Sequence, residues 1–213
     1  MPLNRIFDTA PKSFGQDDIV GNIRSGMQID GKPVALQEWR VTTGDPDVAQ
    51  VISDLYGGKA ESWETKSEQS LQVLTEASSL HVQLISLQAN FALWGRANTP
   101  IRVCDGVSQQ DDANSPCACP SDVKEHKEAA RAGTACQPNI RAVVRLTDNP
   151  DLGLFRYSSG SWQLAKEIGP IEAKINESDA PLEGTIHLEM VEWTTKQGQN
   201  RAFTKPIITL LDE

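Results

Sequence analysis

The 213-residue sequence lacks any apolar run that approaches the roughly 20 residues needed to span a bilayer. Its first residues, Met1 to Asp8, also lack the charged start and the apolar stretch of a signal peptide. These absences predict a cytoplasmic protein without membrane contact. The length suffices for one sizeable core, or for one main domain that carries a smaller module.

The common motifs of catalysis are also missing. A Gly-rich phosphate-binding loop that ends at Gly58 would need a glycine where Ser53 stands. There is no G-x-S-x-G elbow, and the three histidines, His81, His126 and His187, form no metal-binding pair. We therefore predict a non-enzymatic protein that has no catalytic residues and no small-molecule substrate.

Basic residues are in short supply, because 20 Lys and Arg face 29 Asp and Glu and give a formal net charge of -9. Non-specific affinity for DNA comes mainly from Lys and Arg that neutralise phosphates. A local basic patch can override the total charge. We expect little or no direct DNA binding, and the balance favours a protein partner, including one that is already bound to DNA.

The residues that are present indicate an α+β fold of antiparallel β-hairpins, a few helices and a small cysteine module. One helix is clear, because Asp45 is a good N-cap, Pro46 suits the first turn and Gly57 supplies the stop. Residues 1–33 contain four glycines and few apolar side chains, which predicts an irregular segment. The other predicted strands lie at 34–41, 140–146 and 152–157, and a hairpin is predicted at 71–94 with its turn at 76–79. A helix is predicted at 162–168, with Ser161 as its N-cap and with Gly169 and Pro170 at its end. A last hairpin is predicted at 186–211, and Pro206 makes its return strand an edge strand or a broken one.

All four cysteines lie within 33 residues. Disulfides are rare in the cytoplasm, whereas four thiolates satisfy the tetrahedral coordination of Zn²⁺. The usual structural site has two pairs of ligands with short spacing, and the single C-x-C here leaves four free thiols as the alternative. We predict a structural Zn²⁺ without an open position for catalysis, bound by Cys104, Cys117, Cys119 and Cys136.

The segment around the cysteines is polar. Residues 121–132 have a helix-forming composition, but Val123 is their only bulky apolar residue, so burial alone would not hold this helix in place. A metal-bound cysteine at each end would order it. His126 could replace one cysteine as a ligand, but in the middle of the helix it is expected to face solvent. We therefore divide the chain into residues 1–103 and 139–213, which form the main α+β domain, and a zinc-binding insertion module at 104–138.

Several stretches of the chain resemble one protein family. These stretches are Pro2 to Phe7, Arg24 to Gly26, Pro33 to Asp45, Cys117 to Pro138 and Leu152 to Trp162. Over about residues 2–211 the sequence resembles the recombination directionality factors that are encoded by actinobacterial phages and prophages.

The resemblance implies a partner and a role. Such a factor binds a phage serine integrase on att-site DNA and switches it from integration (attP with attB) to excision (attL with attR). The integrase serine would cut and rejoin DNA, while this chain, in the cytoplasm of the bacterial host, would favour one arrangement of the integrase coiled-coil arms. The polar helix at 121–132 is one candidate docking surface, and a merely solvated face is the alternative.

Other functions stay open at this point. The main alternative is a zinc-stabilised nucleic-acid-binding regulator, because five tryptophans could include a stacking platform for bases, although most are expected in or near the core. A salt-dependent affinity for random DNA without any integrase would favour that alternative. A zinc enzyme would need an open coordination position, and a phage structural protein would form large homo-oligomers.

Overall fold

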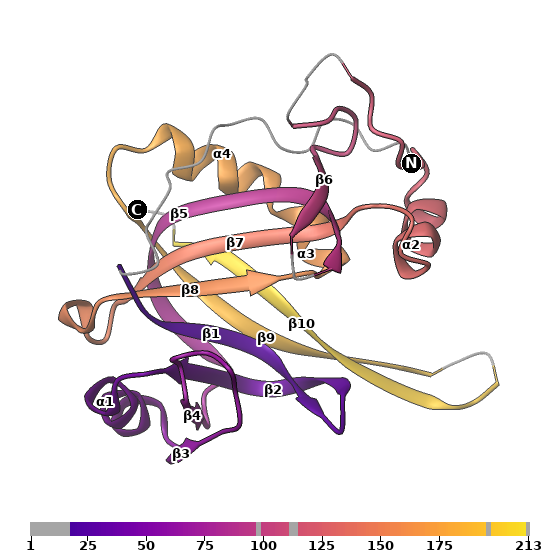
Figure 1. The fold of residues 1–213 in the computed structure, drawn as a ribbon. Helices are drawn as coiled ribbons and strands as arrows, with labels where there is room; N and C mark the ends of the chain where they lie inside the picture. Colours follow the sequence, from indigo (N-terminus) through magenta and orange to yellow (C-terminus); the bar gives the residue numbers. More distant parts are fainter. Residues whose placement is uncertain (1–17, 97–98, 111–114, 195–196, 212–213) are drawn as a thin grey trace.

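A computed structural model describes residues 18–96, 99–110, 115–194 and 197–211. Ten strands form one large, mostly antiparallel sheet, with helices beside it and over it (Figure 1). The elements are β1 (Ile19–Ile29), β2 (Lys32–Thr43), α1 (Pro46–Tyr56), β3 (Ala60–Ser62), β4 (Leu71–Leu74), β5 (Ser79–Trp94), β6 (Pro100–Cys104), α2 (Val123–Arg131), β7 (Gln137–Leu146), the 3-10 helix η2 (Pro150–Leu152), β8 (Leu154–Ser159), α3 (Trp162–Glu167), α4 (Gly169–Glu177), β9 (Leu182–Thr194) and β10 (Asn200–Leu210). The predicted α+β class is confirmed.

The long strand β5 organises the sheet. The strand order is β10-β9-β5-β7-β8-β1-β2-β4-β3, and β6 pairs with the far end of β5. The only parallel pair among the described strands joins β1 to β8. Because β2 also contacts β9 and β10, which lie far from it in the strand order, the sheet curls strongly on itself. Within the described ranges, no helix is both long enough and apolar enough to cross a membrane.

The first hairpin corrects the prediction that residues 1–33 are irregular. Residues 19–29 are strand β1, which pairs with β2 and so confirms the strand predicted at 34–41; residues 1–17 lie outside the described ranges. Asp30 and Gly31 join the two strands with φ values of 51° and 74°. Positive φ at both central positions defines the type I′ turn that Asp-Gly favours in hairpins.

The hairpin predicted at 71–94 is wrong in its pairing. Both strands exist, but β4 pairs with β2 and β3, whereas β5 pairs with β6, β7 and β9. Residues 75–78, which link the two strands, bond to β2 instead. The Thr75 amide donates to Trp39 O at 2.9 Å, and the Trp39 amide donates to Ala77 O at 2.9 Å. Alternation of apolar residues marks a strand and its buried face without specifying its neighbour.

Most local predictions in the rest of the chain are confirmed. Asp45 caps α1 by accepting from the Asp47 amide at 2.8 Å, and Ser161 caps α3. Strands β7 and β8 form an antiparallel pair, as do β9 and β10, and Pro206 lies on the edge strand β10. Gly169 and Pro170 do end α3, but they also open α4, which the sequence analysis missed. Proline is tolerated in the first turn of a helix, where its missing N–H costs nothing.

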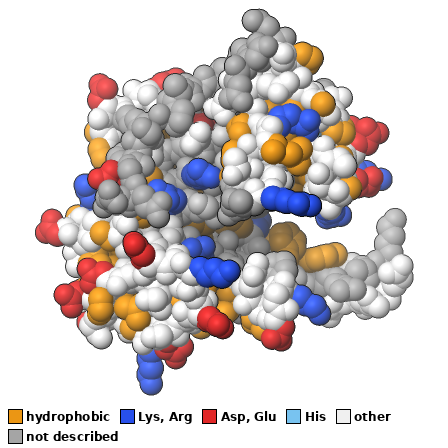
Figure 2. Space-filling model, in the orientation of Figure 1, with side chains coloured by type: hydrophobic (Ala, Val, Ile, Leu, Met, Phe, Trp, Pro, Cys, Tyr) orange, Lys and Arg blue, Asp and Glu red, His pale blue; other side chains and the backbone are white. Residues whose placement is uncertain are grey.

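The core lies between the curled sheet and the helices. Its largest fully buried side chains include Trp39, Phe91, Phe155 and Tyr157, and the rings of Trp39 and Tyr157 meet edge to face at 5.5 Å. Trp39 is buried and Trp63, Trp94 and Trp162 are half-buried, as expected for most of the tryptophans, whereas Trp193 on β9 is 46% exposed. The face drawn in Figure 2 mixes acidic and basic side chains, with hydrophobic side chains scattered among them.

Candidate metal centre

The sheet brings the four cysteines together from three segments. Cys104 is the last residue of β6, and Cys136 directly precedes β7. β6 and β7 pair with opposite edges of β5 around Phe91, so these two cysteines flank the end of this strand, and their Sγ atoms lie within 4.8 Å of each other. Cys117 and Cys119 come from the loop before α2, which is held to the preceding loop by the hydrogen bond from the Cys117 amide to Val107 O at 2.7 Å.

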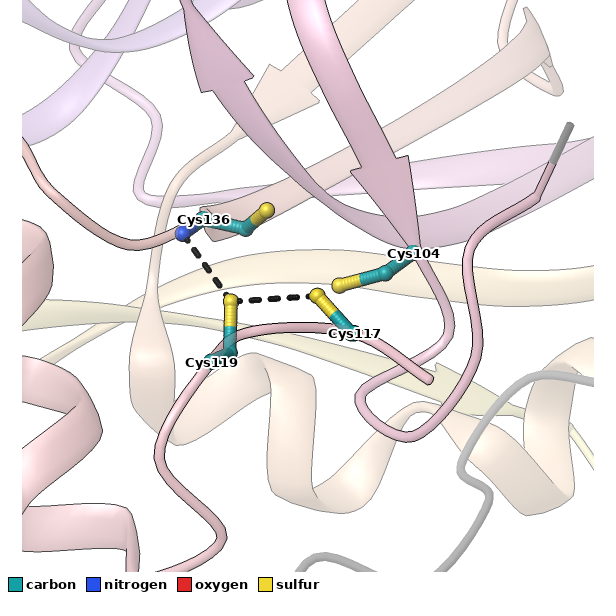
Figure 3. A group of neighbouring side chains, drawn as sticks. All are labelled: Cys104, Cys117, Cys119 and Cys136. Atoms are coloured by element: carbon teal, nitrogen blue, oxygen red, sulfur yellow. Dashed lines mark hydrogen bonds between the residues drawn. The ribbon is translucent and has the colours of Figure 1, made fainter. Parts of the chain in front are cut away.

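The sulfur atoms face a common centre (Figure 3). All four Sγ atoms lie within 4.8 Å of one another, and those of Cys117 and Cys119 are 3.3 Å apart. These separations exceed the roughly 2.05 Å of a disulfide. A tetrahedral site with bonds of about 2.3 Å places its sulfur atoms ~3.8 Å apart. The four cysteines therefore form a cluster whose donors and spacing fit a metal ion.

The ionisation of the cluster also fits a cation. Hydrogen bonds from Cys104 and Cys136 lower the pKa of Cys119, and the Cys136 amide donates to the Cys119 sulfur at 3.3 Å. The hydrogen bond to Cys119 raises the pKa of Cys104 well above its usual value. A negative charge on the Cys119 sulfur in turn raises the pKa of Cys136. A divalent cation would remove that repulsion and allow all four to ionise.

Arg102 lies against the cluster. Its Nε is 3.4 Å from the sulfur of Cys136, and its Nη2 is 3.6 Å from the sulfur of Cys119. Hydrogen bonding to Cys136 raises the pKa of Arg102 above its usual value. A divalent ion with four thiolates carries a net charge of -2, which Arg102 partly offsets. The sequence analysis missed this residue, although strand periodicity places it on the same side of β6 as Cys104.

His126 corrects the expectation that it faces solvent. It is fully buried, and its ring centroid lies 5.2 Å from that of Phe91 and 5.0 Å from that of Trp162. Its Nε2 donates to Cys136 O at 2.7 Å. The imidazole thus packs between two aromatic rings and bonds the backbone of Cys136, and α2 is held by this side chain as well as by the flanking cysteines. His126 does not belong to the four-sulfur donor group.

The fold and the cysteine cluster define a mostly β, α+β protein that carries a candidate metal centre on an excursion from its sheet. Residues 20–210 match the model of the Gp3-like family, whose description is recombination directionality factor-like. The match spans nearly all of the described chain. The protein therefore belongs to the Gp3-like, recombination directionality factor-like family, and the family resemblance noted in the sequence is confirmed. No solved structure matches the chain.

Proposed function

We propose that this chain is a recombination directionality factor. It binds a phage-encoded serine integrase on att-site DNA in the cytoplasm of the bacterial host, and it switches the integrase from attP with attB to attL with attR. The observation that carries the proposal is the family match over residues 20–210. The net charge of -9 supports a route to DNA through a basic, DNA-bound partner rather than through phosphates directly.

In this proposal the chain supplies binding energy and no chemistry. It redirects the integrase by binding one arrangement of the coiled-coil arms more tightly than the other. A shift of such a balance from 1:99 to 99:1 needs about 5.5 kcal/mol of differential affinity. A factor that bound both arrangements equally would change nothing, however tightly it bound.

The proposal assigns a structural role to the cysteine cluster. Cys104, Cys117, Cys119 and Cys136 would hold Zn²⁺ in a closed site, and residues 104–138 would form an insertion module on the domain built by residues 1–103 and 139–213. Thiolate ligands and a tetrahedral arrangement suit zinc among the common divalent ions. Cobalt substitution tests the ligand set, because four sulfur ligands give intense charge-transfer absorption and a tetrahedral visible spectrum. A spectrum that requires nitrogen or oxygen ligands would remove this assignment.

The functional test combines the purified protein with its cognate serine integrase on each pair of att sites. We expect recombination of attL with attR to appear and recombination of attP with attB to fall. Co-migration of both proteins on att-site DNA in a gel shift checks binding separately from switching. If neither recombination nor migration changes, the proposal fails. A salt-dependent shift of random DNA by this protein alone would then favour a nucleic-acid-binding regulator.

A further inference from the structure

Two arginines stand opposite each other on the first hairpin. Arg24 on β1 and Arg40 on β2 are register partners, and Arg40 is only 4% exposed. Like charges directly opposite each other in a sheet are destabilising, and a buried cation is costly unless an anion faces it. Burial lowers the pKa of Arg24, and burial together with the charge of Arg24 lowers that of Arg40.

Neither guanidinium has an acidic partner among the described residues. Arg40 donates from Nε to Gln72 Oε1 at 2.8 Å, and its guanidinium carbon lies 4.3 Å from the centroid of the Trp63 ring. Arg24 donates from Nε to Thr42 Oγ1 at 3.2 Å. These neutral contacts fix both groups in place through Nε, and among the described residues no hydrogen bond engages the Nη groups, which can therefore bind a ligand.

A hollow of about 760 Å³ lies over this pair. Arg24 and Arg40 line it together with Trp63, Met27 and Val34, so cationic and apolar surfaces adjoin in one site. Arg24 also lines a second hollow of about 630 Å³, which contains the basic residues Lys66 and Arg156. The geometry of two fixed guanidinium groups in a concave site is suited to an oxyanion, which arginine binds in a bidentate manner.

We propose that this hollow receives an acidic side chain, Asp or Glu, of the protein partner. A carboxylate with apolar neighbours matches the arginines and the walls formed by Trp63, Met27 and Val34. A nucleic-acid backbone, with many charges along its length, is repelled more strongly than one carboxylate by Glu64 in the same hollow, by Glu68 in the next one and by the net charge of -9. The identity of the partner as a serine integrase rests on the proposed function.

The test compares matched arginine variants in binding to the immobilised cognate integrase. We expect the double variant Arg24→Gln, Arg40→Gln to bind roughly tenfold or more weakly, since two charge-assisted hydrogen-bonding groups are lost. Arg40→Lys should retain part of the affinity, because it keeps the charge but not the fork. Arg141→Gln is the control: Arg141 is exposed and also lies against a tryptophan, with its guanidinium carbon 5.9 Å from the Trp94 centroid. Thermal unfolding of each variant separates loss of binding from loss of fold.

The site can also be probed without the integrase. Sodium acetate, titrated at constant ionic strength, should shift the Trp63 indole N–H resonance saturably in the wild type and not in the double Gln variant. Sodium chloride and inorganic phosphate are titrated alongside it. A stronger response to phosphate, or a loss of att-site DNA binding by the double variant in the absence of integrase, would overturn the carboxylate assignment in favour of nucleic acid.

The outcomes separate this inference from the proposed function. If the wild type and the folded double variant bind the integrase equally, the arginine site is wrong while the proposed function stands. If the wild type does not bind the integrase at all, the proposed function fails, and the acetate titration alone decides the site. No saturable shift in that titration would overturn the carboxylate site.

Discussion

Two regions of the molecule, the curled sheet and the cysteine excursion from Cys104 to Cys136, differ in what keeps them ordered. The sheet buries large apolar side chains such as Trp39, Phe155 and Tyr157 completely. Among its described residues, the segment from Cys104 to Cys136 buries few side chains, namely Cys104, His126, Ala135 and Cys136, and the other residues of its helix α2 are half-buried or exposed. Burial of apolar surface stabilises a fold by about 25 cal/mol per Å², and this gain offsets the conformational entropy that is lost when a chain is ordered. A segment that lacks such burial needs cross-links instead, and a metal ion is the strongest one that its residues could form.

The two regions meet at one side chain. Phe91 on β5 is the register partner of Cys104 in β6 and of Pro138 in β7, and its ring faces His126 and Trp162. The cysteine excursion therefore starts at the end of β6 and ends at the start of β7, the two strands that pair with β5 at Phe91. The excursion thus depends on the sheet for its geometry, while the sheet contacts the excursion at this end. Variants that weaken one region at a time test this asymmetry.

Removal of the proposed Zn²⁺ should have the largest effect. We expect a chelator, or Cys119→Ser, to reduce bound zinc from one ion per chain to almost none. Structural zinc contributes about 10 kcal/mol or more in small zinc domains, so amides of α2 should lose their protection from hydrogen exchange. Amides at the β9 end of β5 should keep theirs. Ser121→Ala is the control next to the ligand loop. A metal-free wild type in which α2 stays protected would show that packed thiols suffice.

A core substitution in the sheet should behave in the opposite way. Phe155 on β8 is fully buried, and its ring packs against Gly21, where an added Cβ would come within 2.9 Å of it. We expect Phe155→Ala to lower the free energy of unfolding by about 3–5 kcal/mol, by loss of buried area and formation of a cavity. Denaturant unfolding should show both regions losing structure together, at unchanged zinc content in the folded state. Phe203→Ala, at a side chain that is 45% exposed, is the matched control, with a change of about 0.5 kcal/mol or less.

Local signals in the sequence were sufficient for some elements and not for others. Helix α1 was predictable because its signals, Asp45 and Pro46 at the start and Gly57 at the end, act within a few residues of one another. The strand partners of β4 and β5 were not predictable, since pairing depends on contacts that are distant in sequence. The β1–β2 hairpin was missed although the Asp30-Gly31 dipeptide is a strong turn signal, because the glycines were interpreted only as interruptions.

The candidate site shows the same division. Four cysteines in one short stretch were sufficient to predict a cluster, because only their own chemistry was needed. The burial of His126 was beyond the reach of local reasoning, since the rings that cover it come from β5 and α3, far away in the chain. The paired arginines of the first hairpin were equally hidden, because their juxtaposition follows from the register of a hairpin that was not predicted.

A smaller effect on stability is expected from pH, through a buried carboxylate that contacts the sheet. Glu172 on α4 is 4% exposed and accepts from the Ala89 amide at 2.9 Å, and burial raises its pKa to about 7. Because the folded state then binds a proton more tightly than the unfolded state, this group's contribution to stability is greatest below pH ~4.5 and is lost as the pH rises toward 7. We expect at most about 3 kcal/mol in total.

The measurement is the free energy of unfolding of the wild type and of Glu172→Gln between pH 5 and 8. As the pH rises over this window, the free energy of unfolding of the wild type should fall relative to that of Glu172→Gln. Glu177→Gln, at an exposed position of the same helix, should follow the wild type. Effects of pH on the thiolates cancel in this comparison, because the cysteines are the same in both proteins. A constant difference across the window would show that Glu172 ionises normally in the folded protein.

The smallest effect tests the junction of the two regions. His126→Phe keeps a ring between Phe91 and Trp162 but removes the hydrogen bond to Cys136 O, which leaves a buried carbonyl without that donor. We expect a loss of about 1–2 kcal/mol, seen as faster hydrogen exchange in α2 with the exchange of β9 and β10 unchanged. His81→Phe, at an exposed position of β5, is the matched control. If β9 and β10 were to loosen by the same amount as α2, the two regions would form one cooperative unit, and the asymmetry inferred from Phe91 would be wrong. If α2 alone responds, the excursion is a separately opening unit whose order is set by its ligands and by this one imidazole.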